Sequence, residues 1–305
     1  NNNSNSNNNS NHNHLLPLTT SHHPHTQTHA PQMSTTRIPG LVQLGEQYRC
    51  WMIYKRGDDL RQDQFILQMI GLMDRLLKRE NLDLKLTPYR VLPTGSDEGL
   101  VEFVSGFPLS TVLADHRSIH RFLSIHQSDP RGPFGLKAEC LDAFIRSCAG
   151  YCVLTYILGV GDRHLDNLML RTDGRLFHID FAYILGRDPK PFPPPMKLCR
   201  EMVEAMGGAD SMYYVQFRTF ACEAYNILRK NADLILSLFH LMAGASIEAI
   251  RADPEKAALK LLDNFRLDLD DAQSVDWMQR LINESATALI PQIVETTHRW
   301  AQYWR

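Results

Sequence analysis

The sequence predicts an α+β fold in two lobes, with a small lobe of strands around one helix and a larger lobe that is mostly helical. Before residue 105, runs rich in β-branched and aromatic residues alternate with turn residues around a single amphipathic helix. After Ser105, most apolar residues recur at helical spacing. The chain has 305 residues, of which 44% are hydrophobic, so it can bury one large core or two modest cores.

The first 40 residues differ in composition from the rest of the chain. Asn, Ser, His and Thr dominate there, and apolar residues are scarce. Such a segment cannot bury enough apolar surface to offset the entropy that is lost on ordering. We therefore predict a disordered low-complexity segment over residues 1–40.

The small lobe is predicted over residues 41–104. Trp51, Ile53 and Tyr54 indicate a strand, and a turn follows at Gly57. A helix opens at Asp63, because the apolar residues after it recur every three or four positions: Phe65, Ile66, Met69, Ile70, Met73, Leu76 and Leu77. Two more strands are predicted over residues 89–92 and 99–104.

The large lobe is predicted over residues 105–305, with the lobe boundary near residues 104–107. Its least helical part is the segment 159–200, which contains one short strand at residues 175–179. The chain ends in a predicted amphipathic helix, whose apolar face carries Ile282, Leu289, Ile293, Trp300 and Trp304.

Charge and cysteine content argue against several classes of function. The formal net charge is −2, so the whole molecule has no basic bias, and we expect no nucleic-acid partner. The six cysteines show no C-x-x-C spacing, which favours core residues over a metal site. There is no secretory signal, and the longest apolar run, residues 148–160, is too short to span a bilayer. We therefore expect a cytoplasmic protein.

One stretch carries four groups that can handle protons or metal ions. Asp162, His164 and Asn167 lie in the run Gly-Asp-Arg-His-Leu-Asp-Asn, and Asp180 follows 13 residues after Asn167. In phosphoryl transfer, an Asn and an Asp hold Mg²⁺ on the ATP phosphates, and a nearby Asp or His receives the proton of the attacking hydroxyl. The step from Asp162 to Asn167 matches the step in the protein-kinase loop H-R-D-x-x-x-x-N, although the first three letters are reversed.

Three further blocks accompany this motif. Residues 55–63 read Lys-Arg-Gly-Asp-Asp-Leu-Arg-Gln-Asp, residues 184–197 contain Gly-Arg-Asp-Pro-Lys-Pro and Pro-Pro-Pro-Met-Lys, and the chain ends in Ala-Gln-Tyr-Trp-Arg. Together the four blocks resemble the phosphatidylinositol 3- and 4-kinases, and the last two are similar to class III phosphatidylinositol 3-kinase. The resemblance covers about residues 50 to 305 and implies a two-lobed, protein-kinase-like catalytic domain.

Asn167 and Asp180 are the expected ligands of Mg²⁺ or Mn²⁺, since such ions prefer oxygen donors. Two residues compete for the role of base. The spacing favours Asp162, whereas a pKa near neutrality favours His164. In the resembled family the His usually has this role, so we expect His164 to be the base and Asp162 to orient it.

ATP is expected between the lobes. Lys55 ends a strand before a Gly turn, so its ammonium group can reach the nucleotide phosphates. The resemblance places Asp63 and Tyr89 in the nucleotide pocket. It also makes Glu102, Phe103 and Val104 the hinge, where backbone groups meet adenine.

The activation segment, residues 183–200, bears on the substrate. Arg187, Lys190, Lys197 and Arg200 stand against Asp188, a net charge of +3. Class I enzymes have a run of consecutive basic residues here, whereas this segment has few cations and a Pro-rich stretch that favours extended backbone. We therefore expect unphosphorylated phosphatidylinositol as the substrate, with Arg187, Lys190 and Lys197 at its headgroup.

The resemblance implies phosphorylation of the 3-hydroxyl of phosphatidylinositol, which gives phosphatidylinositol 3-phosphate. It also implies a protein-kinase-like regulatory subunit, a Beclin-type subunit and peripheral attachment to endosomal or autophagic membranes, with the last six residues at the membrane. Two alternatives stay open. One is a non-catalytic kinase-like fragment that binds a membrane or a partner, and the other is a 4-kinase or a protein-kinase relative.

Two features depart from the family pattern. Ala182 follows Asp180-Phe181 where the family has Gly, and a left-handed backbone at Ala would cost about 1–2 kcal/mol. The phosphate-covering loop expected before Lys55 would fall within the Asn-, His- and Thr-rich segment. The sequence therefore predicts an incomplete small lobe.

Overall fold

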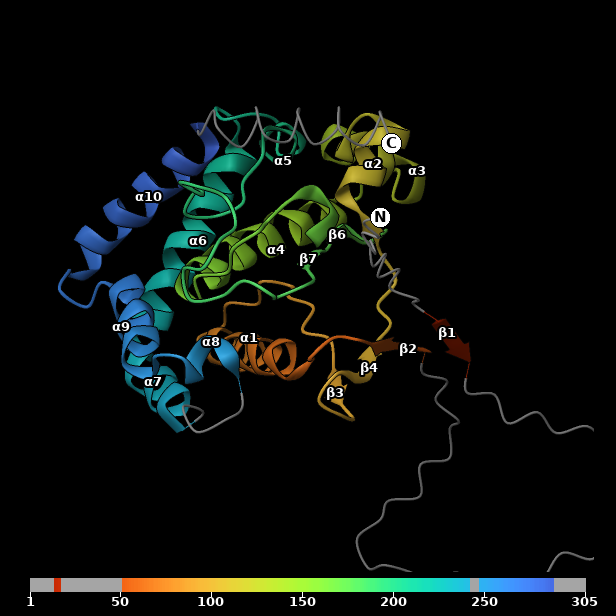
Figure 1. Cartoon of the computed structure of the whole chain (residues 1–305). Coiled ribbons are helices and arrows are strands. Elements are labelled where there is room, and N and C mark those ends of the chain that lie inside the picture. Colours follow the sequence, from red (N-terminus) through yellow and green to blue (C-terminus); the bar gives the residue numbers. More distant parts are fainter. Residues whose placement is uncertain (1–13, 18–50, 242–246, 288–305) are drawn as a thin grey trace, which may run out of the picture.

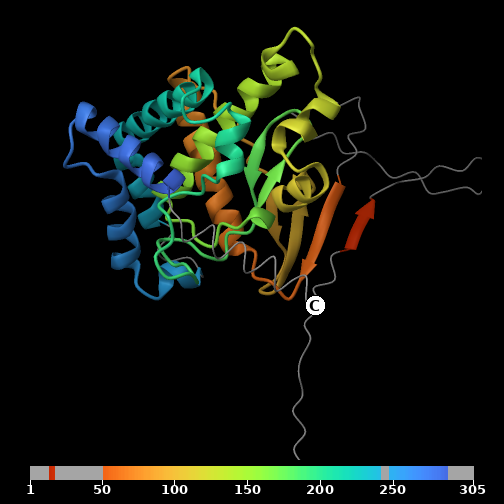
Figure 2. The same cartoon turned by 90° about the horizontal axis from the view of Figure 1, so that it is seen from above.

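The computed structural model describes residues 14–17, 51–241 and 247–287 (Figure 1). It contains two antiparallel sheets, with strand orders β1-β2-β4-β3 and β5-β6-β7. The strands are β1 (His14–Pro17), β2 (Trp51–Arg56), β3 (Val91–Pro93), β4 (Glu98–Glu102), β5 (Phe107–Pro108), β6 (Leu168–Leu170) and β7 (Leu176–His178). Seen from above, the early strands stand on one side and most of the later helices on the other (Figure 2).

Strands and one helix form the described small lobe, and helices make up most of the described large lobe, so the predicted α+β class is confirmed. The α-helices are α1 (Arg61–Arg79), α2 (Leu109–His116), α3 (Ile119–His126), α4 (Ala138–Ile157), α5 (Arg200–Ala205), α6 (Met212–Lys230), α7 (Ala232–Leu241), α8 (Glu248–Arg251), α9 (Pro254–Phe265) and α10 (Asp271–Thr287). Two 3₁₀ turns are η1 (Pro133–Gly135) and η2 (Leu165–Asn167).

The small lobe follows the predicted order of strand, helix and two strands. α1 begins two residues before Asp63 and buries all seven of the predicted apolar positions. β2 and β4 pair antiparallel, with Lys55 opposite Gly99. β3 is shorter than predicted and starts at Val91, so the buried Tyr89 precedes the strand.

β1 lies inside the segment that we predicted to be disordered, and the prediction is wrong for these four residues. β1 pairs with β2 from His14 opposite Tyr54 to Pro17 opposite Trp51. Two leucines in this short stretch distinguish it from the polar sequence around it, and the edge of β2 offers unpaired backbone groups that can hold a further strand. The other residues of the predicted disordered segment lie outside the described part of the chain, as do residues 288–305, which include Leu289, Ile293, Trp300 and Trp304.

α4 is the central helix of the large lobe. Its sequence is apolar on nearly every side, and 15 of its 20 residues are buried. It is long and apolar enough to cross a membrane, but 83% of its most apolar window is buried inside the fold, as is typical of a core helix. α6 packs against α4, and α10 packs against α6. The predicted strand at residues 175–179 is β7, which also packs on α4.

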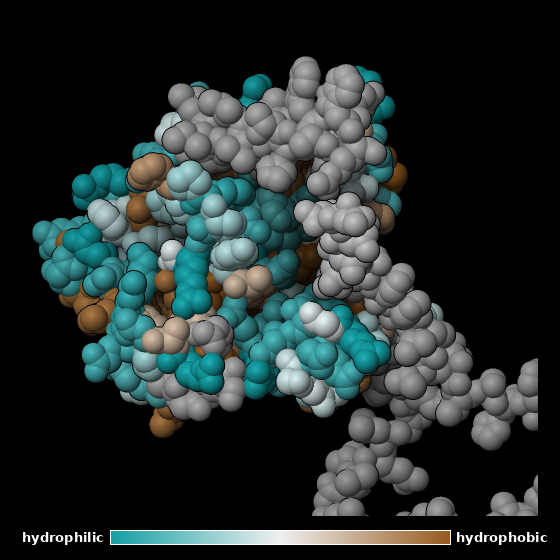
Figure 3. All heavy atoms as spheres, viewed as in Figure 1, coloured by the Kyte–Doolittle hydropathy of each residue, from teal (hydrophilic) through white to brown (hydrophobic). Residues whose placement is uncertain are grey.

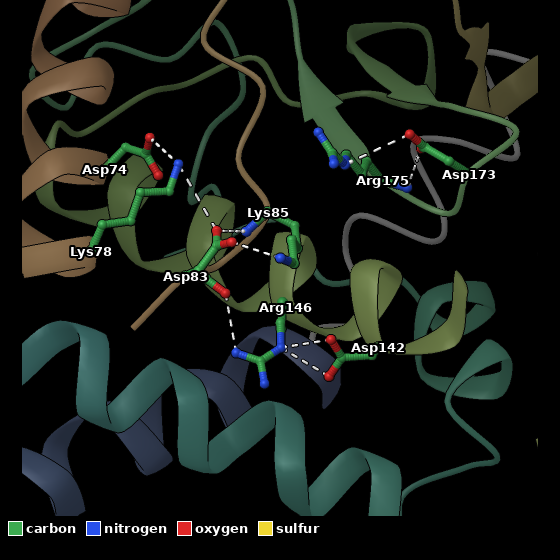
Figure 4. A network of polar contacts seen from close by, with 8 residues as sticks. All are labelled: Asp74, Lys78, Asp83, Lys85, Asp142, Arg146, Asp173 and Arg175. Carbon is green, nitrogen blue, oxygen red and sulfur yellow. Dashed lines mark hydrogen bonds and ion pairs between the residues drawn. The ribbon is translucent and has the colours of Figure 1, made fainter. Parts of the chain in front are cut away.

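A polar brace joins α1 to α4 through the segment that follows α1 (Figure 4). We define the brace by Asp74, Lys78, Asp83, Asp142 and Arg146. The Lys78 ammonium lies 2.7 Å from Asp74 Oδ2 and 3.9 Å from Asp83 Oδ1. The Arg146 guanidinium donates to the Asp142 carboxylate at 2.7 and 2.8 Å and to the Asp83 carbonyl at 3.1 Å. The brace therefore fixes the C-terminal end of α1 on the large lobe.

Arg146→Ala should lower the free energy of unfolding by about 1–3 kcal/mol, because it removes three hydrogen bonds and the cation from the face of the Phe220 ring, 4.3 Å away. Arg175→Ala is the control, since Arg175 Nε is 3.6 Å from Asp173 and the side chain is 40% exposed. The control should change stability by less than about 0.5 kcal/mol. Equilibrium denaturation of both variants checks this, and equal losses would contradict a specific role for the brace.

Candidate active site

The end of α4 and a short hairpin position the candidate catalytic residues. After α4 the chain runs through residues 158–164 into η2 and β6, and β7 returns antiparallel with His178 opposite Leu168. The Ile179 N–H donates to the Asn167 carbonyl at 3.1 Å, so Asn167 and Asp180 lie at the same end of the hairpin. The space-filling view shows a hollow with hydrophobic side chains near its centre where the two lobes meet (Figure 3).

Asn167 and Asp180 offer oxygens suited to a divalent cation. The Asn167 Nδ2 donates to the Asp162 carbonyl at 3.0 Å, and within the described residues Asn167 Oδ1 has no hydrogen bond. Asp180 is exposed, and its Oδ1 accepts the Ala182 N–H at 3.2 Å, which leaves Oδ2 available. Mg²⁺ needs only one or two protein oxygens when phosphates and water complete its octahedron. The two residues therefore fit such an ion.

His164 lies between two carboxylates. Its Nε2 is 3.8 Å from Asp162 Oδ2, and its Nδ1 is 3.6 Å from Asp166 Oδ2. The Ser110 hydroxyl donates to the same Asp166 carboxylate. Partial burial lowers the pKa of His164 below its ordinary value, although both carboxylates act to raise it. The imidazole is therefore neutral near pH 7, as a proton acceptor must be.

Arg163 has a structural role in this arrangement. Its side chain is buried, and it donates to the carbonyl oxygens of Gly161 and Ile179, each at 2.8 Å, and to that of Asp180. The guanidinium also lies 5.7 Å from the centre of the Phe181 ring. Arg163 thus connects the catalytic loop, which we define as residues 161–167, to the segment after β7.

The start of α1 contacts the residues after Asp180. The Gln62 side chain donates to the carbonyls of Phe181 and Ala182 at 2.7 and 2.9 Å, and the Asp63 carboxylate accepts the Phe181 N–H at 3.2 Å. Burial raises the pKa of Asp63 from 3.8 to about 6, and the nearby charge of Lys55 opposes this rise. Lys55 itself is about one-third exposed, with its ammonium 3.4 Å from Asp58. Lys55 and Asp63 therefore share one region of the site.

Comparison with known proteins decides the family. The family profile described as phosphatidylinositol 3- and 4-kinase matches residues 50–129 and 107–251. The chain belongs to the phosphatidylinositol 3- and 4-kinase family.

Several relatives of this family carry the name phosphatidylinositol 3-kinase. The chain is 66% identical over 256 residues to phosphatidylinositol 3-kinase VPS34 of Arabidopsis thaliana and 65% identical over 256 residues to the root isoform of Glycine max; both matches cover 84% of this chain. It is 49% identical over 273 residues, or 90% of the chain, to phosphatidylinositol 3-kinase VPS34 of Saccharomyces cerevisiae. The chain spans about a third of the length of these relatives, 31% of each.

Of the three residues predicted to form the hinge, Val104 alone has a backbone N–H without a hydrogen bond among the described residues. The Glu102 N–H donates to the Arg90 carbonyl at 2.8 Å and the Phe103 N–H to the Trp51 carbonyl at 2.9 Å, because both residues continue the sheet. No hydrogen bond among the described residues uses the backbone of Val104. Tyr89 is 8% exposed and lies edge-on to Phe177, and burial raises its pKa well above its ordinary value. The phenol is therefore neutral, as suits a pocket wall.

The three cations predicted at the headgroup differ in their exposure and contacts. Arg187 is exposed, and the Lys190 ammonium is 3.8 Å from Asp162 Oδ1. Lys197 is only 6% exposed, so the headgroup role predicted for it is not supported. Its neighbours Met196 and Leu198 are buried, which draws the intervening side chain into the large lobe. The Lys197 carbonyl accepts a hydrogen bond from the Cys152 thiol of α4 at 3.5 Å.

Ala182 is compatible with the observed backbone. The left-handed angle in this part of the family motif falls on Asp180, at φ 60°, and Ala182 is not among the residues with positive φ. The strain expected from replacing Gly at residue 182 is therefore absent in this conformation. Gln62, Asp166 and Asp188 also make contacts in the site; all three lie inside the motifs found in the sequence, but nothing in the motifs predicted a contact for them.

The raised pKa of Asp63 predicts a pH effect on stability. Folding favours the protonated carboxyl, so its contribution to stability is present below about pH 4 and is lost as the pH rises through about 6. Relative to Asp63→Asn, the wild-type chain should lose up to about 3 kcal/mol across this window. Denaturant titrations of both chains at several pH values, in a metal chelator, check this. If the free energies of unfolding of the two chains changed with pH in parallel, that result would contradict a raised pKa of Asp63.

Proposed function

We propose that this chain is the catalytic part of an ATP-dependent lipid kinase that phosphorylates the 3-hydroxyl of phosphatidylinositol. The observation that carries the proposal is the joint placement of a neutral His164 and two oxygen donors, Asn167 and Asp180, around one hairpin. The relatives named phosphatidylinositol 3-kinase match this region at 49–66% identity.

The proposed mechanism assigns a role to each polar group. Asn167 Oδ1 and the Asp180 carboxylate would hold Mg²⁺ or Mn²⁺, which when bound neutralises charge on the ATP phosphates. The His164 Nε2 accepts the proton of the inositol hydroxyl. The Asp162 carboxylate, 3.8 Å away, then stabilises the imidazolium that forms.

The same proposal places the nucleotide between the lobes. The free N–H of Val104 donates to adenine, and the neighbouring residues Glu102 and Phe103 form the strand end that holds Val104. Tyr89 forms a wall of the pocket. The ammonium of Lys55 faces the phosphates as a compact positive charge, and Asp63 shares its region of the site.

For the lipid, we propose that Arg187 and Lys190 contact the phosphodiester of the headgroup. The short distance from Lys190 to Asp162 supports this, since it brings a cation beside the catalytic loop. The protein-kinase-like and Beclin-type subunits, and attachment to endosomal or autophagic membranes, belong to this proposal on the strength of the family resemblance. A purely binding role is disfavoured, because Lys55, Asp162, His164, Asn167 and Asp180 are all present.

Asp180→Asn should abolish the phosphorylation of phosphatidylinositol, because the amide is a weaker metal ligand and lacks the charge. A loss of about 10²–10³-fold or more is expected. The assay mixes the purified chain with phosphatidylinositol vesicles, labelled ATP and Mg²⁺ or Mn²⁺, and identifies the phosphorylated ring position. Asp210→Asn is the matched control, since Asp210 is exposed and outside the site.

A normal rate from a folded Asp180→Asn chain would contradict the metal assignment. A 4-phosphate product would replace the 3-kinase proposal by a 4-kinase. Nucleotide binding without any product from the folded wild-type chain would favour the binding-module alternative.

A further inference from the structure

The start of the activation segment runs beside the catalytic loop. The Leu185 N–H donates to the Leu158 carbonyl at 3.0 Å, and the Gly186 N–H donates to the Gly159 carbonyl at 2.9 Å. The Gly161 N–H donates back to the Tyr183 carbonyl at 2.9 Å. These bonds bring residues 183–188 alongside residues 158–162, although the two stretches are more than 20 residues apart in sequence.

One carboxylate continues this contact beyond the backbone bonds. Asp188 Oδ2 accepts the N–H of Asp162 at 2.8 Å, and Asp188 Oδ1 accepts the N–H of Lys190 at 2.8 Å. Each oxygen of Asp188 therefore holds one residue of the site, the first on the catalytic loop and the second on the activation segment. A carboxylate that accepts backbone N–H groups makes stronger hydrogen bonds than a neutral acceptor.

Asp162 needs this support because its backbone is in the left-handed region, at φ 52°. This conformation costs roughly 1–2 kcal/mol for a residue with a side chain, so it persists only where the surroundings hold it. Asp188 holds the N–H of Asp162, and the Asn167 side chain holds its carbonyl at 3.0 Å. With its backbone fixed on both sides, the Asp162 carboxylate lies 3.8 Å from His164 Nε2 and 3.8 Å from Lys190 Nζ.

Gly161 permits the close approach on which this link depends. A Cβ atom at Gly161 would lie 2.2 Å from the Arg187 carbonyl oxygen and 2.9 Å from Asp188 Oδ2. A carbon atom cannot lie so close to the Arg187 carbonyl oxygen. Because this oxygen belongs to the backbone, it cannot rotate away as the end of a flexible side chain could. Any side chain at residue 161 would therefore push the activation segment away from the catalytic loop.

A cavity of about 440 Å³ lies against Gly186, Arg187 and Asp188, and its other walls come from residues 159–161, residues 193–195 and the helices α4, α9 and α10. Trp277 and Leu281 of α10 line its far side. The backbone hydrogen bonds and the Asp188 carboxylate therefore act together with the buried Ile184 and the Lys260 side chain to fix residues 186–188 beside the catalytic loop.

We propose that Asp188 is a positioning residue that joins the activation segment to the catalytic loop and sets the Asp162 carboxylate beside His164 and Lys190. This inference rests on the proposed lipid kinase function. Asp188 thereby couples Lys190, the cation proposed to contact the headgroup, to Asp162, the residue proposed to orient the base. A displaced activation segment therefore also disturbs His164, the proton acceptor.

The test compares four single variants and one double variant of the full chain with the wild type. Asp188→Ala removes both bonds, Asp188→Asn keeps one acceptor oxygen, and Gly161→Ala displaces the segment. Asp263→Ala is the control, since Asp263 lines the same cavity, is exposed and has no side-chain hydrogen bond among the described residues. Each variant is assayed for kcat and for the KM of both substrates, and by hydrogen exchange of the peptide containing residues 159–165.

Asp188→Ala should lower kcat by about 10–100-fold, as is usual when an orienting partner is lost, with the KM for ATP unchanged. Hydrogen exchange should rise in the peptide of residues 159–165 and not in α4 or α6. Asp188→Asn should show an intermediate loss, and Asp263→Ala none. The double variant Gly161→Ala, Asp188→Ala should lose about the same factor as the more severe single variant, because both changes break one link.

Unchanged kcat and unchanged exchange in Asp188→Ala would overturn the proposal. A rise of exchange throughout the fold with a lower melting temperature would also overturn it, since that result means a general structural role. If the wild-type chain phosphorylates no lipid, the proposed function fails, and the exchange measurement alone then decides whether Asp188 holds the catalytic loop.

Discussion

The arrangement of the site depends on the hydrogen bonds and charge interactions of the buried Arg163 guanidinium. A charge removed from water is costly unless hydrogen bonds and opposite charges compensate for it. Arg163 has both: three backbone carbonyls accept from it, and Asp63, Asp162 and Asp180 act on it electrostatically. The three carboxylates in turn need Arg163, because they lie in one region and would repel one another without a fixed cation. Arg163 thus allows an acidic site to exist before any metal ion is bound.

α1 is held at both ends, and this connects the small lobe to the same site. At its C-terminal end, the brace around Arg146 fixes the segment that follows the helix on α4, and Leu84 and Leu86 of this segment lie against Gly150 of α4. At its N-terminal end, Gln62 and Asp63 bind the backbone of residues 181–182. A shift of α1 would therefore move the residue next to Asp180, so the position of the small lobe and that of the proposed metal ligands are linked.

The parts of this protein that the sequence predicted well are those where chemistry or periodicity restricts the residue types. The apolar repeat from Phe65 to Leu77 predicted the buried face of α1, and the short strand predicted at residues 175–179 contains β7. Its hairpin partner β6 was not predicted. Burial of Lys197 was not predicted, because a count of charges ignores the apolar neighbours that draw the side chain inward. The hydrogen bonds of the Arg163 and Asp188 side chains were not predictable either, because their partners are backbone groups, which do not depend on residue type.

The structure sharpens the electrostatic argument about the substrate. By sequence, the activation segment carries four cations against Asp188, a net charge of +3. In the fold, Lys197 is buried, and the Arg200 guanidinium is 2.6 Å from Glu204. Of the four, Lys190 lies beside the catalytic loop, 3.8 Å from the Asp162 carboxylate, and Arg187 is exposed. A headgroup with further phosphates would bring several more negative charges next to Asp162 and Asp180, whereas a single phosphodiester matches the two cations proposed to contact it. The reduced charge therefore supports unphosphorylated phosphatidylinositol more strongly than the sequence count does.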